Sequence, residues 1–201
     1  MLELLKTFIF FFAVIDPIGS VPVYMAATKQ FSVKQKRKIA IKATIIAGAV
    51  LVFFIVVGEP LMSAMHITLP AFQMAGGIIL FLFALTMVFS GKPENETKLI
   101  KDHEHVTVFP IAVPSIASPG AIMAAVLVTD NNTHTFSEQL VTTSIILLVL
   151  TVTCLMLLGA RYIQEKIKEA GITLISKVMG LLLAAFAMQS ILTGITEYFH
   201  L

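Results

Sequence analysis

The chain has 201 residues, of which 57% are hydrophobic and 13% are charged. A soluble domain is typically about 45–50% apolar and about a quarter charged, so this composition excludes an ordinary water-soluble domain and predicts a surface that faces lipid. The formal net charge of +2 gives no reason to expect a nucleic-acid partner. The single cysteine, Cys154, excludes an intramolecular disulfide and the metal sites that need paired cysteines, and we interpret it as a small buried hydrophobic residue.

Six segments have the roughly 20 mostly apolar residues that a membrane-spanning helix needs. They are Leu2–Ala27, Ile39–Ala64, Leu69–Ser90, Val106–Val128, Gln139–Ala160 and Leu174–Phe199. We expect the first segment to be a retained span rather than a cleaved signal peptide, because Glu3 offsets Lys6 and no basic leader results. The sequence therefore predicts an all-α membrane protein of six spans, with residues 1–201 as a single membrane domain.

Positive charge is distributed unevenly among the intervals between these spans. Every Lys and Arg except Lys6 lies in or beside the first, third and fifth intervals, and the second and fourth intervals contain none. Cytoplasmic loops carry the excess of Lys and Arg, so we expect these three intervals in the cytoplasm and both termini outside it. We interpret the dense run Lys34–Lys38 as a topology signal and an anchor to anionic lipid head groups, rather than as a specific lipid or partner site.

Two short motifs outside the spans have ordinary explanations. His103-Glu104-His105 suggests a metal site, but it lies in a charged interval without a further cluster of ligands, so we predict a solvated loop and no metal. Asn131-Asn132-Thr133 matches a glycosylation sequon on the expected outer side, which matters only in a secretory pathway. We predict no cofactor.

The two halves of the chain resemble each other weakly, at a spacing of roughly 100 residues. The matching positions are Ile15-Asp16-Pro17 with Ala117-Ser118-Pro119, Phe31-Ser32 with Phe136-Ser137, and Gly77, Leu80, Phe83 and Ala84 with Gly180, Leu183, Phe186 and Ala187. Each half holds three spans, an odd number, so the second copy would enter the membrane from the opposite face. We predict a first repeat at about 1–90, a cytoplasmic linker at about 91–105 and an inverted second repeat at about 106–201. Such repeats are typical of secondary transporters; the alternative is a duplication in a protein that does not transport.

The first and fourth spans each contain a helix-breaking motif near the middle. These are Asp16-Pro17-Ile18-Gly19-Ser20 and Ser115-Ile116-Ala117-Ser118-Pro119-Gly120. An Asp or Ser followed by Pro is typical of a helix N-cap with proline at the first helical position, so both spans are predicted to consist of two half-helices. The first amides of each new helix would be free and partly positive. We expect these free amides at Ile18, Gly19, Ser20, Gly120 and Ala121.

The carbonyls that end the first half-helices, near Phe12 to Val14 and Ile111 to Val113, would also lose their partners. Unsatisfied backbone at membrane depth is tolerated only where it is buried in protein or lines a cavity. The pseudo-symmetry would bring the two breaks together. The sequence therefore predicts a small polar pocket lined by Asp16 to Ser20 and by Ser115, Ala117, Ser118, Pro119 and Gly120.

Four polar side chains within the spans have two interpretations each. Asp16 is the acidic side chain expected deep in the bilayer, where it either caps the second half-helix alone or also binds substrate or a proton. Glu59, before Pro60, is either a solvated carboxylate near the outer surface or a second coupling residue in a proton relay. Gln189 and Thr193 are expected to be interhelical hydrogen-bond partners rather than ligands. Gly76-Gly77 and Gly180 are expected to pack the repeats together.

The chain resembles the MarC family of small bacterial and archaeal membrane proteins, some of which are described as transporters of small neutral amino acids. The residues that carry the resemblance are Ile15-Asp16-Pro17-Ile18-Gly19, Gly58-Glu59, Gly76 through Phe81, Val113-Pro114 through Pro119, and Met179 through Ala184. The resemblance implies six spans, inverted repeats, a location in the bacterial inner or plasma membrane, and a substrate site at the two broken helices. It also implies substrates of glycine or alanine size. One departure is Ser118, where many relatives have glycine, and it leaves the exact substrate open.

We therefore predict a secondary transporter, and not an enzyme, for a small zwitterionic solute. The substrate carboxylate would bind the amides after Pro17 or Pro119, its ammonium would face freed carbonyls or Asp16, and a proton or sodium ion would couple transport. The alternatives are a channel or exporter for another small solute, an intramembrane enzyme, and a non-transporting scaffold. The sequence leaves open whether the chain forms a homo-oligomer.

Overall fold

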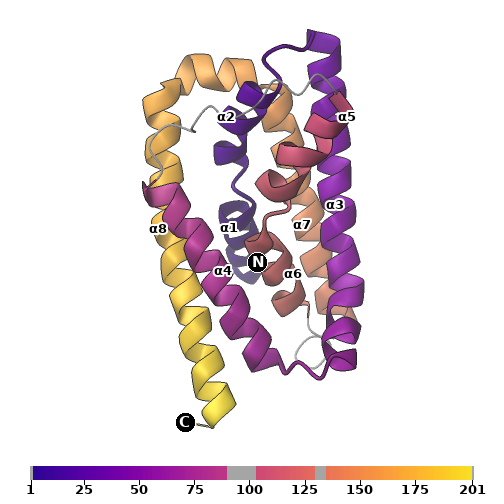
Figure 1. Ribbon diagram of the computed structural model, residues 1–201, viewed down its shortest axis with the longest axis vertical. Coiled ribbons are helices and arrows are strands. Elements are labelled where there is room, and N and C mark those ends of the chain that lie inside the picture. Colours follow the sequence, from indigo (N-terminus) through magenta and orange to yellow (C-terminus); the bar gives the residue numbers. More distant parts are fainter. Residues whose placement is uncertain (1, 90–102, 130–134, 201) are drawn as a thin grey trace.

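The computed structural model describes residues 2–89, 103–129 and 135–200, and every element that they form is a helix. In chain order the elements are α1 (Leu2–Ile15), α2 (Pro17–Ala27), α3 (Val33–Ala64), α4 (Leu69–Phe89), α5 (His103–Val106), η1 (Thr107–Ile116), α6 (Pro119–Val128), α7 (Phe136–Leu158) and α8 (Ala160–Phe199). Figure 1 shows the longer helices lying roughly along the long axis of the molecule. The predicted linker at 91–105 and the Asn131-Asn132-Thr133 sequon fall wholly or mostly outside the described residues.

Length and composition identify the membrane-spanning segments. Within the described residues, five helical segments are long and apolar enough to cross a bilayer, and α1 and α2 together form the first of them. A sixth is present if the segment from His103 to Val128, which bends by 55° before α6, is one span. The fold is therefore an all-helical membrane architecture with five or six spans.

The second span begins earlier than its hydropathy predicts. The sequence places the start at Ile39, whereas α3 starts at Val33, so the basic run from Lys34 to Lys38 forms helix rather than loop. Ser32 caps the helix: its side chain accepts a hydrogen bond from the Gln35 amide, and the Gln35 side chain returns to the Ser32 backbone. This capping box fixes the helix start, and hydropathy cannot detect it because the first turns are charged. α7 starts with the same motif, built from Thr135 and Glu138.

The expected loop between the fifth and sixth spans is also helical. α8 begins at Ala160, separated from the end of α7 at Leu158 by Gly159 alone, and runs without interruption to Phe199. Figure 1 shows that the first part of α8 crosses one end of the molecule before the helix turns along the long axis. The exposed Tyr162 ring lies 5.2 Å from Lys166 Nζ in this part. A loop was the wrong prediction here because charge, which interrupts a span, does not oppose a helix.

The core lies where the interrupted spans pack on α3 and α7. Its largest fully buried side chains include Phe11, Ile15, Ile111 and Ile116. On α3, buried small residues repeat at helical spacing, at Ala40, Ala43, Ala47 and Gly48, and they let neighbouring helices approach closely. The interrupted spans are thus the most enclosed part of the chain.

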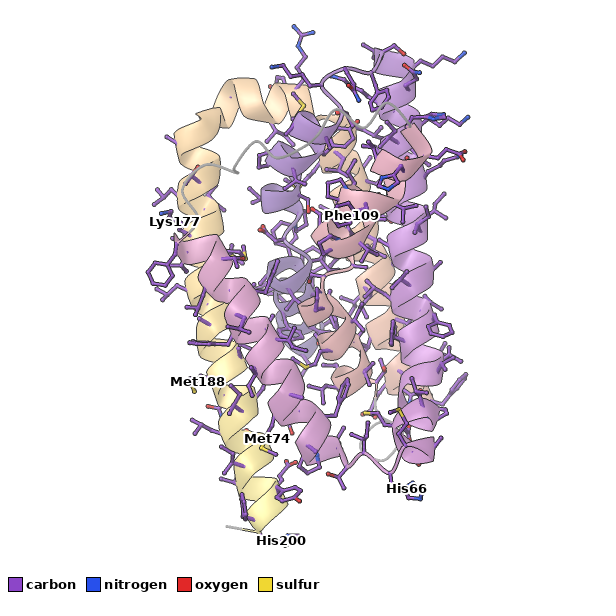
Figure 2. The ribbon with its side chains drawn as sticks, viewed as in Figure 1. His66, Met74, Phe109, Lys177, Met188 and His200 are labelled. Atoms are coloured by element: carbon purple, nitrogen blue, oxygen red, sulfur yellow. The ribbon has the colours of Figure 1, made fainter. Side chains whose placement is uncertain are left out.

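The α4–α8 pair has the closest backbone approach between long helices. A Cβ added to Gly77 would lie 3.0 Å from the Ala187 carbonyl, and one added to Gly180 would lie 3.1 Å from the Ala84 carbonyl. At Gly194 it would lie 2.9 Å from the Pro70 carbonyl and 2.7 Å from Met74, which Figure 2 shows between the two helices. Packing roles are therefore confirmed for Gly77 and Gly180. Gly76 packs α4 against Met123 of α6, so its packing role is confirmed as well.

The outer surface is largely apolar. Phe53, Leu82, Leu148 and Leu182 are each more than half exposed, and Met188 points away from the bundle in Figure 2. A soluble monomer rarely exposes so many large apolar residues. Lipid is the environment that such a surface matches.

Candidate functional site

The first interruption is a single residue, Asp16, between α1 and α2. Its backbone is left-handed, with φ 47° and ψ 67°, a conformation that aspartate tolerates better than most residues do. Pro17 follows as the first residue of α2 and has no amide hydrogen to continue the helix. Asp16 Oδ1 accepts a hydrogen bond of 2.9 Å from the Gly19 amide, so the side chain is the N-cap of α2.

Gly19 makes room for this carboxylate. A Cβ on Gly19 would collide with Asp16 Oδ2, so any larger residue would push the cap away from the helix. The Asp16 side chain is almost enclosed, because the residue is only 7% exposed. Its Oδ2 accepts no hydrogen bond from the described residues. No fully buried side-chain oxygen among the described residues lacks a hydrogen-bond partner, so Oδ2 is not sealed inside the protein. Capping uses only one of the two carboxylate oxygens of Asp16.

The second interruption precedes α6. Ser118 has extended backbone, is fully buried, and caps α6 by accepting a hydrogen bond of 3.1 Å from the Ala121 amide. The preceding segment η1 is wound more widely than an α-helix and is itself extended at Phe109 and Val113, each of which precedes a proline. The chain bends here by 55°, whereas the break between α1 and α2 is less sharply bent and the two helices form one span. The two interruptions therefore share a cap and a proline but differ in shape.

The two interruptions meet through a pair of serines. The Ser115 hydroxyl donates a hydrogen bond of 3.1 Å to Ser20 Oγ, and the Ser20 hydroxyl lies 3.4 Å from the Ser115 carbonyl oxygen as a donor to it. Ser20 is in the first turn of α2 and Ser115 is at the end of η1. Segments 95 residues apart in the chain are thus joined at the positions where each span is broken.

Most of the amides predicted to be free are occupied. Gly19 and Ala121 donate to the capping side chains, and the Ser20 amide donates to the Asp16 carbonyl at 3.0 Å. The prediction was wrong for Gly19 and Ala121 because each capping side chain accepts from the amide three positions later. It was wrong for Ser20 because its amide, four residues after Asp16, makes the first intrahelical hydrogen bond of α2. Only Ile18 and Gly120, of the five amides predicted, have no acceptor among the described residues.

Two of the carbonyls predicted to be free are occupied as well. The Phe12 carbonyl accepts from the Asp16 amide at 3.1 Å, and the Ala112 carbonyl accepts from the Ala117 amide at 2.9 Å. In both half-helices the last turn closes on the residue that begins the break. Fewer backbone groups are therefore open to a ligand than the sequence predicts, and the open amides are in the first turns of α2 and α6.

Two further residues predicted to line the site differ in their exposure. Ala117 is fully buried between η1 and α6, while Pro119 is exposed. The sequence did not predict that Leu80 of α4 lies against Gly120. Gly120 itself indicates such a contact, because a glycine leaves space that a neighbouring side chain can fill. Which side chain fills it depends on how the helices pack, and the sequence alone does not show that.

Glu59 lies away from the breaks. Its neighbour Gly58 packs against Val126, which is seven residues beyond Pro119 on α6. At 1.5 Å per helical residue, that separation is about 10 Å. Glu59 is half-buried and makes other interactions within the described chain. The structure thus does not bring the two predicted coupling carboxylates together at one site.

Gln189 and Thr193 are hydrogen-bonded to each other along α8, at 3.3 Å, rather than between helices. The prediction of interhelical partners was wrong because these residues are one helical turn apart and face the same side. The predicted loop at His103-Glu104-His105 is helical, and Glu104 forms an ion pair of 3.2 Å with Lys42 of α3. Within the part of the chain that the structure describes, no group of three His, Cys, Asp or Glu residues is placed to hold a metal ion.

Comparison with known proteins places this architecture in a family. The model of the MarC family of integral membrane proteins matches residues 1–199. A UPF0056 membrane protein of Methanocaldococcus jannaschii is 34% identical over 189 residues, which cover 92% of this chain and 91% of the relative. A UPF0056 membrane protein of Pyrococcus horikoshii is 34% identical over 206 residues, and one of Buchnera aphidicola is 28% identical over 199 residues; each alignment covers 99% of both chains. No solved structure matches the chain. The chain belongs to the MarC family and is a multi-pass integral membrane protein.

Proposed function

We propose that this protein is a secondary transporter of small neutral amino acids of the glycine and alanine class, and that the substrate binds where the two interrupted spans meet. The observation that carries the proposal is the hydrogen-bonded contact between Ser20 and Ser115. It joins the first turn of α2 to the end of η1, just before the start of α6, and both α2 and α6 have a free amide donor in their first turn. Interrupted helices that meet in this way are the common binding-site design of secondary transporters.

The groups at this junction complement a zwitterion. The amides of Ile18 and Gly120 are donors at helix N-termini, where partial positive charge favours a carboxylate. Asp16 Oδ2, which has no donor among the described residues, supplies the negative charge for an ammonium group. Gly19, Gly120 and Ala121 add almost no side-chain bulk. A small amino acid satisfies donors and acceptor together, whereas a simple anion or cation satisfies only one kind.

Two finer features belong to the same proposal. The chain is built as two inverted three-helix repeats, so that rocking of one repeat against the other exposes the junction to alternate sides. Both termini lie outside the cytoplasm, in agreement with the distribution of Lys and Arg. A proton or a sodium ion drives transport, with Asp16 as the coupling group.

Exchange in proteoliposomes tests the proposal directly. Purified protein is reconstituted with internal unlabelled alanine, and entry of labelled alanine is followed. We expect saturable uptake that glycine competes with and that glutamate and arginine leave unchanged. Unsaturable flux would identify a channel instead, and uptake equal to that of empty vesicles would contradict transport of this substrate class.

A further inference from the structure

Leu80, on α4, lies directly against the start of α6. A Cβ added to Gly120, the second residue of α6, would collide with Leu80 Cδ1, and Leu80 Cγ would be 3.6 Å away. The three atoms nearest to that added Cβ all belong to Leu80. Leu80 is fully buried and Gly120 is buried, so the contact lies inside the bundle.

This contact is part of a matched packing arrangement between α4 and α6. One turn before Leu80, Gly76 receives the side chain of Met123, which is one turn after Gly120. Each helix therefore presents a glycine to a large side chain of the other, in antiparallel register. Such reciprocal packing defines the leucine position closely, because neither helix can shift along the other without moving a side chain onto a backbone.

We propose that Leu80 sets the upper size limit for the side chain of the amino acid bound at the first turn of α6. The inference rests on the proposed transport function and adds a specificity-determining residue that lies outside both interrupted spans. A carboxylate held by the Gly120 amide places the substrate's own side chain beside the same helical turn that Leu80 covers. Gly120 and Ala121 contribute little bulk there, so the isobutyl group of Leu80 is what excludes a larger substrate.

The experiment measures the ratio of valine uptake to alanine uptake in proteoliposomes for three proteins. Leu80→Ala should raise this ratio about tenfold, because an added methylene is discriminated by about that factor or more in a fitted apolar pocket. Leu82→Ala is the matched control: it truncates the same residue type on the same helix, but Leu82 is 58% exposed on the outer surface. Its ratio should equal that of the unaltered protein.

The outcomes separate the two claims. If the unaltered protein takes up alanine and Leu80→Ala has the same valine-to-alanine uptake ratio as the unaltered protein, the role of Leu80 is overturned. The transport function is then unaffected. Absence of alanine uptake in the unaltered protein overturns the transport function. If Leu80→Ala is not recovered as a monodisperse protein, Leu80→Val provides a milder truncation, which should change the ratio in the same direction.

A paired substitution tests the packing independently of transport. Gly120→Ala should lower the melting temperature, because the new methyl group collides with Leu80. Adding Leu80→Ala to Gly120→Ala should recover part of that loss, since the collision is removed. A double variant that is less stable than both single variants would contradict the contact on which the inference depends.

Discussion

Asp16 combines a backbone role with a charge, and different substitutions separate the two. The residue is left-handed, it caps α2 through Gly19, and its second carboxylate oxygen has no donor among the described residues. Asparagine retains the capping oxygen and tolerates the left-handed region, alanine retains neither property, and glycine retains only the backbone freedom. Comparison of the three variants therefore distinguishes a structural aspartate from a functional one.

Asp16→Asn should unfold at nearly the same temperature as the unaltered protein. Its gradient-driven alanine uptake should fall at least about tenfold, since the removed charge is what holds the ammonium group or the coupling ion. Asp16→Ala should lose about 1–2 kcal/mol of stability from the missing cap and the strained backbone. Thermal unfolding in detergent and uptake assays provide the two measurements. Full gradient-driven uptake by Asp16→Asn would reduce Asp16 to a helix cap.

At the scale of elements, the pairing of α4 with α8 depends on backbone contact at glycine. Gly77, Gly180 and Gly194 are points of close approach, and each lies opposite a carbonyl oxygen of the other helix. Because lipid tails are as apolar as leucine, close packing rather than burial stabilises such a pair. A single methyl group at these positions must therefore separate the helices along much of their length.

Gly77→Ala should destabilise the protein by about 1–3 kcal/mol, as expected of an overpacked interface. The added Cβ would lie 2.7 Å from Ile191 and 3.0 Å from a carbonyl. The control is Gly159→Ala, where the nearest atom is 3.4 Å away and φ is −91°, so the melting temperature should barely change. Equal melting temperatures for the two variants would show that α4 and α8 are not in close contact at Gly77.

The sequence predicted the elements unevenly, and the errors share a physical cause. Hydropathy located the apolar part of each span but missed the charged beginnings of α3 and α8, because charge opposes membrane insertion without opposing helix formation. Aspartate or serine before proline predicted both interruptions. The same caps accept hydrogen bonds from the Gly19 and Ala121 amides, which the sequence predicts to be free donors. Residue preferences therefore predict where the two helices break, but they do not predict which backbone groups at the breaks remain without a hydrogen bond.

At the scale of the whole molecule, features that depend on tertiary packing could not be predicted. The repeat suggested that the breaks meet, but it did not identify Ser20 and Ser115 as the residues that join them. Nor did it place Leu80 against Gly120 or separate Glu59 from the junction. These relations arise from how the helices pack, and a single sequence carries no direct record of that packing.

The orientation of the molecule in the membrane also belongs to this scale. Figure 2 shows His66 and His200 at the same end of the molecule, and the basic run at the start of α3 is separated from His66 by the whole of that helix. In a Cys154→Ser background, a membrane-impermeant maleimide added to intact cells should label His66→Cys but not Lys34→Cys. The reverse pattern would invert the proposed topology.

The central claim is that the two interrupted spans meet, and an engineered disulfide between them measures it most directly. Ser20→Cys and Ser115→Cys are combined with Cys154→Ser, the membranes are oxidised, and the remaining alkylatable thiols are counted by mass spectrometry. The hydroxyl oxygens are 3.1 Å apart, which is compatible with the roughly 3.5–4.5 Å Cβ separation of a disulfide. The account predicts that both thiols disappear, while a Ser20→Cys and Ser144→Cys pair, whose second position is on the exposed face of α7, stays reduced. Two free thiols in the Ser20 and Ser115 pair under the same oxidation would contradict it.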